Sequence, residues 1–329
     1  MIKQINQAQA MAGGITPGDT PGFPVRITVP GSYELTSNLE VPAGKAGIEI
    51  IASHVTLNLN GFLIFKKVAD PGVLAISAGP AASFISVSNG HIQGMGGISL
   101  AGSAHRVELV QFEGVDPSVC PGISLGDFGV AVRNQVTRVS TGISIGKSGI
   151  VKENVVGDSG HGVSAGENAI VEGNTVDGGA AQASIRAGNG SIVAGNIAGA
   201  NDGGIEVGAF SLVKENTVRN NGDFGIGAGE GSVVAGNRVN HVGHGPGINV
   251  FAGCTVRDNT VSGCGEGIRA AEGAAITVNA VRNNAGFGLT LGPTSGYAGN
   301  VLVGNNGAGP EVSGGIQTDK NVCGAGLCP

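Results

Sequence analysis

An asparagine recurs along this sequence at a nearly constant interval. The successive gaps are 20, 20, 22, 20, 21, 22, 20 and 21 residues. Its positions are Asn134, Asn154, Asn174, Asn196, Asn216, Asn237, Asn259, Asn279 and Asn300. A self-similar period of this length is the signature of a repeat protein, in which each repeat packs only on its neighbours.

Apolar residues, most of them β-branched, keep a fixed register to this asparagine. One set lies eleven positions before it: Ile123, Ile143, Val163, Ile185, Ile205, Ile226, Ile248, Ile268 and Leu289. A second set lies two positions after it: Val136, Val156, Val176, Ala198, Val218, Val239, Val261, Val281 and Leu302. Short runs with two-residue alternation predict β-strands, and a repeat this short leaves no room for a helix as well.

Each repeat therefore predicts one coil of three short strands, each parallel to its equivalent about 4.8 Å away in the next coil. We interpret the asparagine row as a structural ladder rather than a ligand set, because stacked amides hydrogen bond to one another and Asn tolerates a left-handed backbone. Upstream we place Asn60 and Asn89 on the same row and Val110 in the asparagine slot, with loops at 66–72 and 113–122.

The two ends of such a stack of coils need caps, because an open end would expose strand edges and the apolar core. We predict an N-terminal cap and linker over residues 1–24, with a short capping helix at 2–12. The parallel β-helix is expected over 25–310, and a C-terminal cap over 311–329.

Composition agrees with a thin core and excludes some partners. The chain has 62 Gly, 10 Phe and no Trp, and only 13% of its residues are charged. A net charge of −6 leaves no basic stripe for nucleic acid. No continuous apolar stretch is long enough to insert into a membrane. The N-terminal residues lack the apolar core of a signal peptide. We therefore expect either a cytoplasmic protein or one whose leader has been removed.

The five cysteines give one pairing prediction. Cys323 and Cys328 bracket a short Gly-rich loop, and a disulfide between them would close the last turn. Cys254 and Cys264 are either paired or buried as small apolar residues, and Cys120 has no evident mate. Because no C-x-x-C spacing occurs, we expect no structural zinc site.

The recurrent G-I-x-V-G…V-x-x-N-x-V units from Gly122 to Leu302, with the opening PGSYELTSNLEVP…VTLNLNGF, resemble those of right-handed parallel β-helix repeat proteins of the pectate-lyase-like superfamily. The resemblance covers roughly residues 25–325. It implies an all-β, single-stranded right-handed parallel β-helix, as a monomer or homotrimer, in an extracellular or periplasmic setting. It leaves function open, since the superfamily includes lyases, hydrolases, epimerases and tailspikes.

Enzymes of this superfamily usually work on the outer face of the strand that here carries G-I-x-V. Its outward residue lies ten positions before each asparagine: Ser124, Ser144, Ser164, Arg186, Glu206, Gly227, Asn249, Arg269 and Thr290. The turn before this strand adds His161, Asp202, Asp223, His244 and Glu266. Equivalent positions on adjacent coils lie about 5 Å apart, so these side chains are candidates to line one groove.

The catalytic hypothesis uses Arg186, Glu206 and Arg269 with Asp202 or Asp223. A lyase needs a cation to neutralise a uronate and a base to take its C5 proton. A glycoside hydrolase needs two carboxylates roughly 5–9.5 Å apart. In the binding hypothesis a carbohydrate polymer lies on the same row, with four further contacts: Asn249, His161, His244 and Glu266.

Simpler interpretations of the same residues remain open. Arg186 and Glu206 on adjacent coils would form an ordinary surface salt bridge, and single histidines in Gly-rich turns are usually just solvated. We expect no cofactor; a calcium ion at Asp202 and Asp223 is the alternative, and it would need further oxygen ligands.

Two absences favour a binding or structural role over catalysis. With no Trp and only Tyr33 and Tyr297, aromatic platforms for sugar rings are scarce. The Arg-x-Pro-x-x-Arg motif of the lyases is missing, as is the Asp-Pro-His motif of alginate epimerases. We therefore expect a polar groove that binds polysaccharide, with a polysaccharide lyase or glycoside hydrolase acting on an acidic polymer as the alternative.

Overall fold

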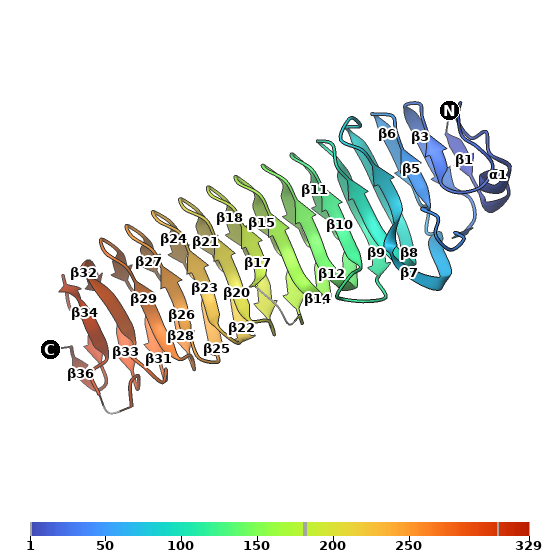
Figure 1. Cartoon of the computed structure of the whole chain (residues 1–329). Helices are drawn as coiled ribbons and strands as arrows, with labels where there is room; N and C mark the ends of the chain where they lie inside the picture. The colour runs from blue at the N-terminus through green and yellow to red at the C-terminus, as the bar shows by residue number, and fades with distance from the viewer. Residues whose placement is uncertain (1, 180–182, 308, 329) are drawn as a thin grey trace. The chain divides into compact units, whose positions relative to one another are not determined.

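A computed structural model describes residues 2–179, 183–307 and 309–328. The chain forms two compact units, unit 1 (1–166) and unit 2 (167–329). Each is a stack of parallel β-coils, with strands on three faces (Figure 1). The predicted all-β right-handed parallel β-helix is thereby confirmed. No helix among the described residues is long and apolar enough to cross a membrane.

Three rows of parallel strands make up unit 1, and some strands bend from one row into the next. The first row holds β2 (Val25–Ile27), β5 (Ile48–Ile50), β10 (Pro121–Leu125) and the C-terminal parts of β7 (Leu63–Ala78), β8 (Ile85–Leu100), β12 (Gln135–Ile145) and β14 (Val155–Ala165). The second row holds β3 (Gly31–Leu35), β6 (Val55–Asn58), the start of β8, β9 (Arg106–Glu113), β11 (Val130–Val132) and β13 (Ile150–Lys152). The third row holds β4 (Leu39–Glu40) and further parts of β7, β8, β9, β12 and β14.

The rows of unit 2 follow the same pattern with shorter strands. The first row holds β17 (Ala183–Ala187), β20 (Gly203–Val207), β23 (Phe224–Ala228), β26 (Pro246–Val250), β29 (Glu266–Ala270), β32 (Leu289–Ala298) and β34 (Val312–Gln317). The second row holds β15 (Ile170–Glu172), β18 (Ile192–Ala194), β21 (Leu212–Lys214), β24 (Val233–Ala235), β27 (Thr255–Arg257), β30 (Ala275–Thr277) and the end of β32. The third row holds β16 (Thr175–Asp177), β19 (Ile197–Gly199), β22 (Thr217–Asn221), β25 (Arg238–Val242), β28 (Thr260–Ser262), β31 (Ala280–Arg282), β33 (Val301–Val303) and β35 (Val322–Cys323).

The core is a set of apolar stacks, flanked by a buried line of amides. Ile205 stacks between Ile185 and Ile226 of the adjacent coils, and all three are fully buried. Between the second and third rows, the side-chain amide of Asn196 donates to Asn216 Oδ1 at 3.0 Å, and that of Asn216 donates to Asn237 Oδ1 at 3.0 Å. Stacking of identical residues thus stabilises both the apolar interior and the corner of each coil.

The assignment of Asn89 to this row is wrong by one residue. Gly90 pairs with Val110, and the Val110 backbone N–H donates to Asn134 Oδ1 at 3.0 Å, so Gly90 occupies the ladder position of its coil. Asn89 takes the preceding left-handed position, with φ of 58°, and Asn60 has a left-handed backbone as well, with φ of 52°. Asn is suited to that backbone, which explains its presence at a neighbouring slot.

The two ends differ from the coils between them. The predicted N-terminal helix is shorter than 2–12: β1 (Lys3–Ile5) pairs with β3, and only α1 (Gln7–Ala12) is helical. At the other end β36 (Gly326–Leu327) turns back antiparallel to β35, and the predicted disulfide joins Cys323 to Cys328. The other three cysteines are free and buried, and burial raises the pKa of each thiol.

Candidate functional site

The first row of unit 2 presents a line of outward side chains on successive coils. Strand pairing places them in the order Arg186, Glu206, Gly227, Asn249, Arg269 and Thr290. Each lies between two inward apolar residues, because side chains alternate along a strand. The row proposed from the sequence therefore exists as one continuous outer face of unit 2.

Arg186 and Glu206 form an ion pair across adjacent coils. Arg186 Nε donates to Glu206 Oε2 at 2.9 Å, with 51% and 46% of the two side chains exposed. Water screens a pair this exposed, and such pairs contribute about 0–1 kcal/mol. The Glu206 carboxylate thus contacts a guanidinium through Oε2.

Arg269 is paired within its own strand. Its Nη2 donates to Glu266 Oε1 at 2.8 Å and its Nε to Glu266 Oε2 at 3.1 Å. This two-point contact holds the pKa of Arg269 above its usual range. Because the carboxylate uses only one edge of the guanidinium, Nη1 and one Nη2 hydrogen remain to bind a ligand.

The candidate residues do not converge on one reacting atom. Glu206 and Arg269 are three coils apart, which is about 14 Å at about 4.8 Å per coil. Asp202 and Asp223 lie on adjacent coils, where the Asp223 backbone N–H donates to the Asp202 carbonyl at 2.6 Å. Both carboxylates are exposed. The described residues contain no group of three or more His, Cys, Asp or Glu that would hold a metal ion.

The two candidate histidines are separate from this row. His244 is exposed on the turn before β26 in unit 2. His161 lies on β14 of unit 1, paired with Thr141 and half-buried. His161 therefore belongs to a different unit from the other candidate residues.

A hollow of about 320 Å³ lies where the outward row reaches Asn249 and Arg269. Phe251, 61% exposed, forms part of its lining two residues after Asn249. Thr290 contributes from the next coil, and its buried Oγ1 has no hydrogen-bond partner among the described residues. The hollow thus combines an aromatic face, an amide and a guanidinium. Phe251 was missed because aromatic platforms were sought only among Trp and Tyr.

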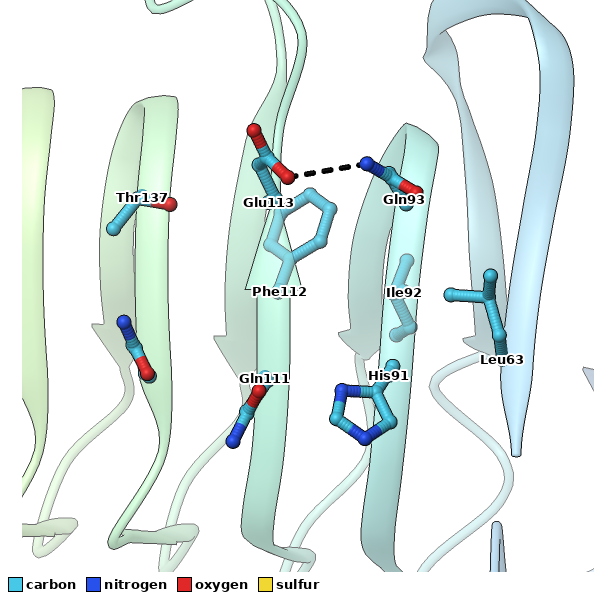
Figure 2. Close-up of a pocket in the computed structure, with 9 residues that line it drawn as sticks. Leu63, His91, Ile92, Gln93, Gln111, Phe112, Glu113 and Thr137 are labelled. Carbon is cyan, nitrogen blue, oxygen red and sulfur yellow. Dashed lines mark hydrogen bonds between the residues drawn. The ribbon is translucent and has the colours of Figure 1, made fainter. Parts of the chain in front are cut away.

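A second and larger groove, of about 520 Å³, lies on the third row of unit 1 (Figure 2). Its lining comprises Leu63, His91, Ile92, Gln93, Gln111, Phe112, Glu113, Gln135 and Thr137. Sequence reasoning missed it. A sequence pattern could have predicted this groove. Polar residues lie one and three positions after the ladder position of successive coils, as Gln135 and Thr137 do after Asn134.

Comparison with known proteins supports the fold. A family model described as a right handed beta helix region matches residues 121–278. The crystal structure of the periplasmic alginate epimerase AlgG is similar, with 14% identity, a TM-score of 0.58, and coverage of 92% of this chain and 84% of that one. The Dettilon tailspike protein gp208 has 15% identity and a TM-score of 0.52, over 80% of this chain.

These likenesses are limited in what they establish. The chain spans only 60% of the length of the tailspike. No protein of curated function matches this sequence. At such low identity a structural likeness shows the fold and leaves the function to be argued from the sites.

Proposed function

Because this chain is a right-handed parallel β-helix protein, with the fold that the resemblance to the pectate-lyase-like superfamily predicted, we propose that it presents the outward row of unit 2 to a carbohydrate polymer. The hollow at Asn249, Phe251 and Arg269 is its central contact. The role is binding rather than catalysis. The alternative is a polysaccharide lyase or glycoside hydrolase that acts on an acidic polymer.

The hollow itself carries the proposal. An exposed aromatic face beside hydrogen-bonding side chains suits a pyranose ring, which has apolar and hydroxyl-bearing surfaces. The free N–H groups of Arg269 suit the carboxylate of a uronic acid. The similar epimerase is named for alginate, a polymer of uronic acids, and this agrees with an acidic ligand.

The placement of the charged groups favours binding over catalysis. A lyase needs its base and its uronate-neutralising arginine at one sugar, whereas Glu206 and Arg269 are about 14 Å apart at the spacing of parallel strands. Glu206 is also held by Arg186. Asp202 and Asp223 on adjacent coils keep the hydrolase alternative open, since two carboxylates at that spacing would fit its geometry.

We further propose an extracellular or periplasmic location. The Cys323–Cys328 disulfide supports it, because such bonds persist in oxidising compartments.

The experiment that tests the proposed function measures binding and product together. Polygalacturonate, alginate and a neutral glucan are titrated calorimetrically, and the same mixtures are assayed for unsaturated uronate and for reducing ends, with and without calcium. Arg269→Gln should weaken binding of the acidic polymers by about tenfold or more, since a hydrogen bond to a charged group contributes about 1.5–3 kcal/mol. Arg282→Gln, an exposed arginine on β31, is the matched control.

The outcomes separate the two hypotheses. Binding without product, weakened by Arg269→Gln but not by the control, supports a binding protein. Product that disappears in Glu206→Gln, Asp202→Asn or Asp223→Asn, while binding persists, would establish the enzyme instead. If none of the polymers binds, the carbohydrate role is wrong.

A further inference from the structure

The groove of unit 1 has a regular polar lining built on four coils. Leu63, His91, Gln111 and Gln135 pair in register along its length. Two residues further along their strands, Gln93, Glu113 and Thr137 form a parallel line. Ile92 and Phe112 are buried beneath these polar residues. The two lines point out of the sheet as one surface (Figure 2).

One line has unused hydrogen-bonding capacity. In the described part of the chain, the side chains of His91, Gln111 and Gln135 have no hydrogen-bond partner, and all three are exposed. The buried ladder amides of the coil corners, by contrast, are bonded at both ends. An amide side chain offers two donors and one acceptor oxygen, so this line can pair with adjacent hydroxyl groups of one ligand.

In the other line, Gln93 and Glu113 contact each other, and Glu113 also contacts an arginine. Gln93 Nε2 donates to Glu113 Oε2 at 3.1 Å, and Arg138 Nη1 lies 3.3 Å from Glu113 Oε1 (Figure 2 shows the first contact). Glu113 therefore has one contact on each side, and these contacts favour one orientation of its carboxylate in the wall of the groove. Fixed side chains lower the cost of ordering the site when a ligand binds.

Charge and topology narrow the ligand class. Glu113 is the one carboxylate among the lining residues, no lining residue is Lys or Arg, and the Arg138 contact offsets its charge. A polyanion would find no free cation in this lining. An extended peptide could not add as a strand, because β8 and β9 already have parallel partners on both sides. A neutral, hydroxyl-rich chain needs neither a cation in the lining nor a free strand edge.

The dimensions fit a short oligosaccharide. From Leu63 to Gln135 the line advances three coils, about 14 Å at about 4.8 Å per coil. Each step is close to the length of one pyranose residue. A volume of about 520 Å³ lies within the usual range for small-ligand sites, about 300–1,000 Å³.

We propose that this groove is a second carbohydrate site, distinct in chemistry from the hollow of unit 2, and that it binds a segment of a neutral polysaccharide lying across β7, β8, β9 and β12. His91, Gln111 and Gln135 bind the sugar hydroxyls, and Glu113 with Gln93 forms the wall beside them. The proposal does not depend on the function proposed for unit 2.

The test uses the full chain and three neutral hexasaccharides: cellohexaose, laminarihexaose and maltohexaose. Calorimetric titration should show saturable binding of at least one of them. The double variant Gln111→Ala/Gln135→Ala should weaken that binding by about fivefold or more, since two net hydrogen bonds of about 0.5–1.5 kcal/mol each are lost. Gln4→Ala, at an exposed glutamine in β1, is the matched control and should bind as the parent does. Thermal melting checks that every variant is folded.

Comparison with the other site keeps the two proposals separable. Arg269→Gln should leave hexasaccharide binding unchanged, and Gln111→Ala/Gln135→Ala should leave polygalacturonate binding unchanged. The groove proposal is overturned if none of the hexasaccharides binds. It is equally overturned if the folded glutamine variant binds them as tightly as the parent, or if Arg269→Gln is the change that abolishes their binding.

Discussion

Replacing Asn216 with alanine should destabilise unit 2 far more than the loss of one surface amide would suggest. The side chain is 1% exposed and makes five hydrogen bonds. Its Nδ2 donates to Val193 O at 2.9 Å, to Lys214 O at 2.9 Å and to Asn237 Oδ1 at 3.0 Å. Its Oδ1 accepts from the backbone N–H and the side-chain amide of Asn196, at 2.8 Å and 3.0 Å.

The cost follows from which groups keep another partner. Lys214 O still accepts from the Gly195 backbone N–H, and Asn237 Oδ1 still accepts from the backbone N–H of residue 216. The backbone N–H of Asn196 loses its acceptor, and a buried orphaned donor costs about 1–3 kcal/mol. The bond to Val193 O and the bond from the Asn196 side-chain amide are also lost, at about 0.5–1.5 kcal/mol each. The free energy of unfolding should therefore fall by about 2–6 kcal/mol in total.

Urea unfolding followed by circular dichroism measures this loss. Thr217→Ala, at the half-exposed neighbouring residue, is the control and should change the free energy of unfolding by less than about 0.5 kcal/mol. If Asn216→Ala costs no more than this control, the ladder bonds would be no better than those the unfolded chain makes with water, and the structural interpretation of the asparagine row would be refuted.

Three further changes probe separate features. Val278 is an exposed β-branched residue with a left-handed backbone, at φ 58°. Val278→Gly should raise the free energy of unfolding by about 1 kcal/mol, which a higher urea midpoint would show. A lower midpoint would mean that the packing of the valine outweighs its backbone strain. Asp70→Asn should lower the free energy of unfolding by about 3 kcal/mol, because it leaves the buried ammonium of Lys66 unpaired. Adding Lys66→Met should restore most of this free energy. No recovery in the double variant would contradict the pairing. The hydrogen bond from Lys66 lowers the pKa of Asp70, so stability from this pair is present above the ordinary Asp pKa and is lost as pH falls through the lower folded value. Burial lowers the pKa of His105, so the free energy of unfolding should fall as pH drops below the ordinary histidine pKa. His105→Ser should reduce the slope of this free energy against pH. An unchanged slope would exclude His105 as its source.

The repeat period was enough to predict the fold and the outward row, because identical positions of successive coils must stack. It also indicated the Arg186–Glu206 salt bridge, but it did not predict the partner of Arg269. Arg269 bonds to Glu266, three residues earlier on the same strand, instead of reaching toward an adjacent coil. A long side chain can reach several nearby partners, and the repeat period alone does not show which partner it binds.

The unit 1 groove was missed for a different reason. Placing Asn89 in the ladder slot assigns His91 to the inward face, whereas the correct slot, Gly90, turns it outward. A slip of one residue exchanges the two faces of a strand. The coil of β8 has its asparagine one residue before the ladder position, so its sequence did not fix the register; Gly90, unlike Val110, is recognised as a ladder position only from strand pairing.

The most direct test of the proposed function uses the absence of tryptophan from this chain. Phe251→Trp places a single fluorescent reporter in the hollow and preserves its aromatic face, and Phe210→Trp places one at another exposed phenylalanine of unit 2 as the control. The predicted result is that oligogalacturonate saturably quenches or shifts the indole emission of the Phe251→Trp variant and leaves that of the control unchanged. If the oligosaccharide binds by calorimetry but leaves the emission of the Phe251→Trp variant unchanged, or does not bind at all, the hollow at Asn249, Phe251 and Arg269 is not the carbohydrate site.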